Sequence, residues 1–243
     1  MKLPEHRTET YEIKVALGLT RTIFRLADNG DANSLASQLR ANRFRLFAEI
    51  LRSVPGQVRI LDAGGTAPTW QRHRNELPKN FHVTLLNKEF AERPQLPHVE
   101  YVLGDARKME MFPDRNFDVC FSNSLIEHLE AGDQVSFANE IRRVSQGYFV
   151  QTPNRYFPIE PHFLVPGWQF LPIGLRAGLL QQMDFGWMKR VPDPAAAREA
   201  VESIRLLNEG ELQRLFADGQ IHREKIGPLT KSLVAWRPIC AKC

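Results

Sequence analysis

The stretch "VRILDAGGTAPTW", residues 58–70, decides the fold of this chain. An apolar run ends at Asp62, Gly64 and Gly65 follow at once, and Pro68 opens the next helical stretch. This order of strand, glycine turn and helix is typical of the first unit of an α/β domain with a parallel sheet. Two adjacent glycines let the backbone turn tightly and approach a ligand without interference from a Cβ atom.

The same loop excludes two common phosphate sites. It reads neither as G-x-G-x-x-G nor as G-x-x-x-x-G-K-[ST], so it indicates neither a dinucleotide pyrophosphate site nor a P-loop. Thr66 is placed to cap the following helix, and Pro68 is tolerated in its first turn. The helix start offers free N–H groups to an anion. Because the loop matches neither phosphate motif, a ligand with a carboxylate and no phosphate suits it better.

Short apolar runs alternate with helical stretches beyond residue 58, which predicts a parallel sheet covered on both faces. The predicted strands cover residues 58–63, 82–87, 99–105, 117–123 and 147–154. Two closing strands, 220–226 and 232–238, follow a capping-box pattern at Asn208 and Glu211.

The predicted domains are an N-terminal helical extension, 1–56, and a sheet domain, 57–243. Within the extension, apolar residues repeat at helical spacing on both sides of "DNGDANS", residues 28–34. Four arginines lie off the apolar stripe of the second helix and fit a solvated face, with a phosphate- or membrane-facing role as the alternative: Arg40, Arg43, Arg45 and Arg52. Residues 155–200, rich in proline and aromatic residues, form an insertion with short helices that we expect to be a substrate-side segment or lid.

Composition restricts the function classes. The net charge is +4 without a dense basic block, which does not demand nucleic acid. Cys120 fits a buried thiol, and the terminal Cys240 and Cys243 fit a frayed tail better than a metal site, so no metal is expected. No apolar run is long enough to span a bilayer, no signal peptide is apparent, and a reducing cytoplasm is the expected location.

Polar residues follow the predicted strands at their carboxyl ends, where open α/β sheets bind ligands. Asn87, with Glu89 nearby, can bond ribose hydroxyls, and Asp105 can accept from an exocyclic amine such as that of adenine. The backbone amide of Ala106 can donate to the neighbouring ring nitrogen. Ribose, adenine and a carboxylate without phosphate together describe S-adenosylmethionine.

The chain resembles the class I S-adenosylmethionine-dependent methyltransferases of the type 11 kind. The resemblance is carried by "ILDAGGTAPTW", "VTLLNKE", "YVLGDARKMEMFPDRNFDVCFSNSLIEHL" and "TPNRYFPIEPHF". It implies a Rossmann-like, mostly parallel seven-stranded sheet with helices on both faces. It also implies the cofactor-binding residues: Asp62, Ala63, Gly64 and Gly65 at the methionyl end with Ser122 and Asn123 near it, Asn87 and Lys88 at the ribose, and Asp105 and Ala106 at the adenine.

Two departures from the family pattern bear on cofactor binding. Thr66 and Pro68 stand where the family's first loop usually has glycines, and Asn87 stands where the second strand usually ends in Asp or Glu. A neutral amide bonds ribose less strongly than a carboxylate, so we expect either weaker binding or substitution by Glu89.

The segment "PNRYFPIEPHF", residues 153–163, follows the fifth strand and lies near the expected methyl donor. Glu160 and His162 are the candidate catalytic residues, because a hydroxyl or acid acceptor needs a base. A rigid proline-aromatic wall is the alternative. Residues 163–190 fit core packing of the insertion, an apolar acceptor pocket or a bilayer surface, so a peripheral membrane contact stays open.

The leading hypothesis is a methyltransferase that acts on a small-molecule, sugar-linked or lipid-linked acceptor, at oxygen. The alternative is a non-catalytic S-adenosylmethionine-binding module. A nicotinamide oxidoreductase is disfavoured by the missing dinucleotide fingerprint. Nucleic acid is not expected as the acceptor, because "TPN" only loosely matches the motifs of amino-methylating enzymes. Oligomeric state is not indicated.

Overall fold

The computed structural model describes residues 34–52, 54 and 56–239. The predicted helix within residues 1–33 and the cysteines Cys240 and Cys243 lie outside these described residues. Contacts divide the chain into two compact units. One comprises Arg43–Phe157 with Arg198–Cys243, and the other comprises Met1–Asn42 with Pro158–Ala197.

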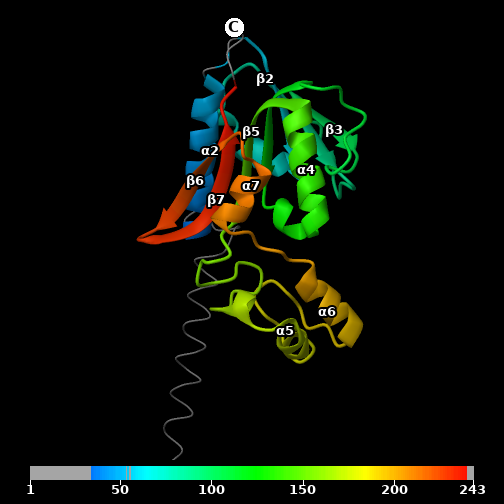
Figure 1. Cartoon of the computed structure of the whole chain (residues 1–243). Coiled ribbons are helices and arrows are strands. Elements are labelled where there is room, and N and C mark those ends of the chain that lie inside the picture. The colour runs from blue at the N-terminus through cyan, green and yellow to red at the C-terminus, as the bar shows by residue number, and fades with distance from the viewer. Residues whose placement is uncertain (1–33, 53, 55, 240–243) are drawn as a thin grey trace, which may run out of the picture. The chain divides into compact units, whose positions relative to one another are not determined.

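Seven strands of the first unit form one sheet in the order β3-β2-β1-β4-β5-β7-β6. Strands β1 to β5 run parallel to one another, and β7 is antiparallel to both β5 and β6 (Figure 1). The predicted Rossmann-like, mostly parallel sheet is therefore confirmed. In chain order the strands are β1 (Val58–Ala63), β2 (Phe81–Asn87), β3 (Val99–Leu103), β4 (Phe117–Asn123), β5 (Ser145–Pro153), β6 (Gln220–Ile226) and β7 (Leu229–Arg237).

The boundaries of the first five strands lie within two residues of the predicted ranges. Strands β1 and β4 agree with the prediction at both ends, β3 ends two residues early and β5 begins two residues early. Buried apolar runs bounded by polar or turn residues carried enough signal to locate them.

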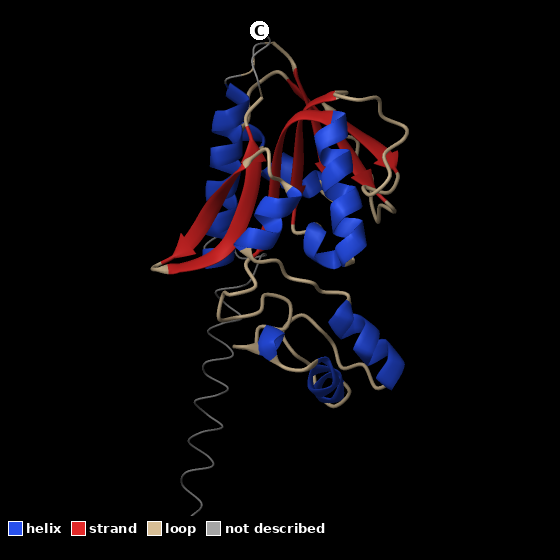
Figure 2. Cartoon of the chain, viewed as in Figure 1, coloured by secondary structure: helices blue, strands red, loops and turns tan. Residues whose placement is uncertain are grey.

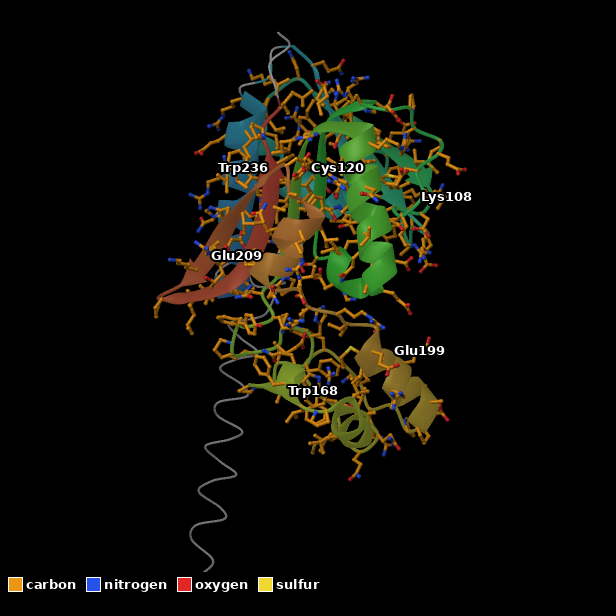
Figure 3. All side chains as sticks on the ribbon, in the orientation of Figure 1. Lys108, Cys120, Trp168, Glu199, Glu209 and Trp236 are labelled. Atoms are coloured by element: carbon orange, nitrogen blue, oxygen red, sulfur yellow. The ribbon has the colours of Figure 1, made fainter. Side chains whose placement is uncertain are left out.

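Helices cover both faces of the sheet (Figure 2). One face packs on α4 (Ala131–Val144) and α7 (Glu209–Leu215), and the other on α2 (Leu35–Arg52) and α3 (Ala67–Arg72). Because side chains alternate along a strand, Leu61 and Ile60 enter opposite cores. Cys120, labelled in Figure 3, is a buried free thiol on the α4 face, as predicted.

Helix α2 confirms the second predicted helix of the N-terminal extension and buries Phe44, Phe47 and Leu51. Each such side chain contributes about 1.5–3 kcal/mol on full burial. Arg45 and Arg52 are exposed as expected. The prediction was wrong for Arg43, which is only 6% exposed, because Glu224 of β6 supplies a buried ionic partner.

Two caps behave differently from one another. Thr66 precedes α3 with no side-chain capping bond, and its hydroxyl instead meets that of Thr69 at 3.1 Å, so the predicted cap is wrong. The capping box of α7 is confirmed. The Asn208 amide donates to Glu211 Oε2 at 2.8 Å, and the Glu211 amide donates to Asn208 Oδ1 at 3.0 Å.

The second unit contains the predicted short helices of the insertion: η3 (Trp168–Phe170), α5 (Ile173–Leu180) and the start of α6 (Pro194–Glu202). Its centre is aromatic, with the Phe163 and Trp168 rings stacked at 4.5 Å and Phe185 at 4.8 Å from Trp168. Trp168 is labelled in Figure 3. Among the described residues, no helix combines the length and apolar character that a bilayer crossing requires.

Candidate functional site

The carboxyl ends of β1, β2, β3 and β4 bring the predicted cofactor residues to one edge of the sheet. The strand order reverses between β1 and β4, which makes this edge the topological switch point. Two backbone bonds tie the loops together there. The Gly64 amide donates to the Leu86 carbonyl at 3.0 Å, and the Gly104 amide donates to the Asn87 carbonyl at 2.9 Å. Residues from four separate parts of the chain therefore meet at one edge.

Asp62 is buried directly beneath the glycine turn. Its Oδ2 accepts from the Trp70 indole at 2.6 Å, while its buried Oδ1 has no hydrogen-bond partner among the described residues. Burial raises the pKa of Asp62 to about 7, against the opposing effect of the Trp70 bond. A Cβ atom at Gly65 would lie 1.5 Å from Asp62 Oδ2, so only glycine fits there. Gly64 has φ of 84°, which also favours glycine.

The second strand end is partly engaged by the first loop. Asn87 Nδ2 donates to the Gly65 carbonyl at 2.8 Å, which uses one of its two N–H donors and leaves its oxygen as an acceptor. Lys88 extends toward Asp105, with Nζ 3.5 Å from Oδ2. The structure therefore places Asn87 and Lys88 beside the glycine loop and the third strand end, as the prediction requires.

Asp105 lies at this edge between two basic side chains, Arg107 and Lys88. Arg107 Nε donates to both carboxylate oxygens, at 2.9 and 3.0 Å, and a second nitrogen donates at 2.5 Å. These bonds and Lys88 hold the pKa of Asp105 far below its ordinary value. Arg107 also pairs with Asp133 at the start of α4. The Asp105 side chain remains 29% exposed, so a ligand amine can share its lone pairs.

At the end of β4, Ser122 and Asn123 take different roles. Ser122 is fully buried, and its hydroxyl donates to the Ala63 carbonyl at 2.9 Å, which joins β4 to β1. Asn123 is half-buried, and its side-chain oxygen accepts from Arg43. Ala63 is itself fully buried and Ala106 packs partly buried against the same core, so both could contribute only backbone groups to a ligand.

Polar groups beyond β5 serve the local structure. Asn154 Nδ2 donates to the Thr230 carbonyl at 2.8 Å, and its Oδ1 accepts from the Tyr156 amide at 3.2 Å. The amide is therefore fixed within a turn. The Thr152 hydroxyl donates to Glu127 at 3.0 Å, with both residues fully buried.

The candidate catalytic pair lies in the second unit. Glu160 is 2% exposed and accepts from the backbone amides of His162 and Phe163, at 2.8 and 2.7 Å. Its other oxygen lies 2.7 Å from His162 Nδ1. The carboxylate therefore orients the imidazole ring through Nδ1.

Three residues of the first unit were missed as contributors to the site: Trp70, Arg107 and Arg43. Trp70 lies within the stretch that decides the fold, and Arg107 lies two residues after Asp105, so both had a local signal. Arg43 had none, because its partners are distant in sequence.

Comparison with protein families finds that residues 79–150 match the model described as a methyltransferase domain. This match covers β2 to β5 and confirms the resemblance to class I S-adenosylmethionine-dependent methyltransferases drawn from the sequence. S-adenosylmethionine is the cofactor that goes with this resemblance.

An uncharacterized protein of Mycobacterium tuberculosis is 29% identical over 65 residues, which are 26% of this chain and 22% of that protein. The matched part thus spans about a fifth of the length of this curated relative.

Several solved structures are partly similar. A SAM-dependent methyltransferase from Aquifex aeolicus is 14% identical, with 89% of this chain and 97% of that chain covered and a TM-score of 0.46. The 1,6-didemethyltoxoflavin N1-methyltransferase of Burkholderia thailandensis, solved with S-adenosylhomocysteine, is 12% identical, with 97% and 92% covered and a TM-score of 0.48. The fold is assigned from the strand order of this chain itself.

Proposed function

We propose that the chain is an S-adenosylmethionine-dependent methyltransferase whose acceptor is a small molecule or a sugar-linked or lipid-linked compound, methylated at oxygen. The observation that carries the proposal is the meeting of Asp62, Asn87, Asp105 and Asn123 at the switch point of a parallel sheet. Acceptors and donors there match a ligand with ribose, adenine and amino-acid groups, and nothing in the loop matches a phosphate.

The residues present fit this cofactor. Asp62 Oδ1 is a buried acceptor without a partner, which suits the α-ammonium group of the methionyl part. Asn87 Oδ1 and Asp105 are acceptors for ribose hydroxyls and the adenine amine. Gly65 cannot be replaced without displacing Asp62, which explains a glycine at this point of the loop. When bound, the cofactor supplies a sulfonium methyl group as the electrophile.

The chain must also accept a proton if the acceptor is a hydroxyl. We assign this role to His162, with Glu160 as the residue that orients its ring. The assignment predicts that His162→Asn lowers kcat. Cofactor affinity should stay unchanged, because the pair lies outside the strand ends that hold the cofactor.

Exposed apolar residues support the acceptor class. Within residues 158–197, four large apolar side chains are about half exposed: Phe170, Leu175, Met183 and Trp187. A contiguous apolar patch marks an interaction site, and we propose that these side chains form one. It suits an acceptor with an apolar part, or contact with a bilayer surface, which sedimentation with lipid vesicles would measure.

The proposal is tested first by calorimetric binding of S-adenosylmethionine to wild type and Asp105→Ala. Stranding the adenine amine should weaken binding by about 1–3 kcal/mol. Asp118→Ala is the matched control, because Asp118 pairs with Arg59 near the starts of β4 and β1, at the opposite edge of the sheet. Equal binding by both variants would place adenine elsewhere.

Transfer is tested with radiolabelled cofactor and the small-molecule, glycan and lipid fractions of a cell extract. Label in one fraction identifies the acceptor class. Cofactor binding with no transfer to any fraction would favour the non-catalytic module instead.

A further inference from the structure

A buried polar cluster links helix α2 to three strands. Arg43 donates to both oxygens of Glu224, from Nε at 2.8 Å and from Nη2 at 2.5 Å, and its Nη1 donates to Asn123 Oδ1. The Ser232 hydroxyl donates to Glu224 Oε2 at 2.6 Å. The side chains of Arg43 and Glu224 are 6% and 7% exposed, so water does not screen the pair.

The chain is shaped to form this cluster. Glu224 is the single buried residue of β6, and a register irregularity between Glu224 and Lys225 interrupts the pairing with β7. Such bulges redirect side chains. Burial opposes the charged form of Glu224, but Arg43 and Ser232 outweigh it, so its pKa lies below the ordinary value. Replacing a buried ion pair with apolar residues of similar size is often neutral or stabilising, so stability alone does not account for the ionic cluster.

The further reason is the orientation of Asn123. An arginine side chain has donors and no acceptor, so the atom of Asn123 that faces Arg43 must be the amide oxygen. This leaves the NH2 group as the free end of the side chain. Among the described residues, none accepts a hydrogen bond from Nδ2. Arg43 therefore holds Asn123 as a hydrogen-bond donor at the end of β4.

The position of this donor indicates its ligand. The parallel register pairs Asp62 of β1 with Phe121 of β4. Continuing this register by two positions along both strands brings Asn123 beside Gly64. The bond from Ser122 to the Ala63 carbonyl supports this extension. Strand β4 lies on the opposite side of β1 from β2 and β3, which carry the proposed ribose and adenine partners. The remainder of S-adenosylmethionine has one group that only accepts hydrogen bonds, its α-carboxylate.

We propose that Arg43, held by Glu224, is a positioning residue that fixes Asn123 as a hydrogen-bond donor to the α-carboxylate of the bound cofactor. The inference rests on the proposed function. It gives helix α2 a role on the cofactor side, whereas the sequence alone favoured a solvated arginine face, with a phosphate- or membrane-facing role as the alternative.

The experiment compares two ligands by calorimetry. S-adenosylhomocysteine carries the α-carboxylate, and 5′-methylthioadenosine lacks the whole amino-acid part. Asn123→Asp keeps an oxygen for Arg43 and removes the donor, so the fold is retained. It should weaken S-adenosylhomocysteine binding by about 10- to 100-fold, the range for a hydrogen bond to a charged group, and leave methylthioadenosine binding unchanged.

Asn139→Asp is the matched control. Asn139 also accepts from an arginine, Arg142, but it lies exposed on α4, away from the strand ends. The substitution makes the same change in charge, and it should leave both affinities at their wild-type values.

Arg43→Lys tests the positioning role. A lysine can pair with Glu224 but lacks the planar fork that reaches Asn123 at the same time. The affinity for S-adenosylhomocysteine divided by the affinity for methylthioadenosine should fall, as it does for Asn123→Asp. A purely structural role of Arg43 would lower both affinities and leave this ratio unchanged. Equal losses for both ligands, or an unchanged ratio in Asn123→Asp, would overturn the inference, while wild-type binding of S-adenosylhomocysteine would still uphold the proposed cofactor site. A wild type that binds neither ligand would overturn both.

Discussion

Replacing Asp62 with asparagine is expected to remove the loss of stability that the Asp62 carboxyl group contributes to the ligand-free protein between about pH 4 and 7. Burial raises the pKa of Asp62 from 3.8 to about 7, and the Trp70 hydrogen bond only partly opposes this. In the unfolded chain the carboxyl loses its proton near its ordinary pKa. In the folded chain it keeps the proton until about pH 7, so the folded state binds more protons in between.

The sign and size follow from this difference. The contribution of Asp62 is fully present below about pH 4 and is lost as the pH rises through about 7. A difference of about 3 pKa units, at 1.36 kcal/mol each, corresponds to about 4 kcal/mol. Asparagine does not titrate, and its oxygen still accepts from the Trp70 indole, which now meets Asp62 Oδ2 at 2.6 Å. Its buried NH2 group adds a penalty of about 1–3 kcal/mol that does not change with pH.

Urea denaturation of wild type and Asp62→Asn, at intervals from pH 4 to 8.5 and without cofactor, measures this contribution. The difference in unfolding free energy should shift by about 4 kcal/mol in favour of the variant across this range. The slope is the test, since the absolute offset includes the asparagine penalty. Asp118→Asn, at the opposite edge of the sheet, controls for loss of a charge. Parallel profiles for wild type and Asp62→Asn would refute the reasoning.

Three further substitutions test other parts of the structure. Gly65→Ala places a Cβ atom 1.5 Å from Asp62 Oδ2, so both the thermal midpoint and the affinity for S-adenosylhomocysteine should fall, and retention of both would contradict the loop geometry. Asn208→Ala removes the α7 capping box and should lower the urea-derived unfolding free energy by about 1 kcal/mol, whereas no change would mean that the cap is unimportant. Gly186→Ala, at φ 55° and with a Cβ atom 2.5 Å from the Phe163 carbonyl carbon, should speed proteolytic cleavage within residues 158–197, and wild-type resistance would count against the described packing.

The sheet could be predicted because its information is local. Each parallel strand is a short apolar run that ends at a polar or turn residue. The capping box of α7 likewise lies within four consecutive residues, from Asn208 to Glu211. The burial of Arg43 could not be predicted, because it depends on Glu224, which lies 181 positions later beside an irregularity in the pairing of β6 with β7. Helical periodicity places Arg43 off the apolar stripe and says nothing of an ionic partner.

The candidate site divides in the same way. Parallel strands place their carboxyl ends together, so Asp62, Asn87 and Asp105 could be assigned to one edge from the sequence. The directions of their side chains could not, because each depends on a tertiary neighbour. The Asp62 carboxylate lies against Gly65 and accepts a hydrogen bond from Trp70. The Asp105 carboxylate accepts hydrogen bonds from Arg107.

The tie between Arg43 and Glu224 also affects the order in which the chain can be completed during synthesis. Arg43 leaves the ribosome long before β6 and β7 exist, and β7 must insert between β5 and β6 to finish the sheet. Until then the guanidinium has no carboxylate, and α2 cannot settle against the sheet without stranding a charge. A nascent chain released before residue 224 should therefore hold α2 loosely. The β6–β7 hairpin then supplies the carboxylate that stabilises the packing of α2 on the sheet.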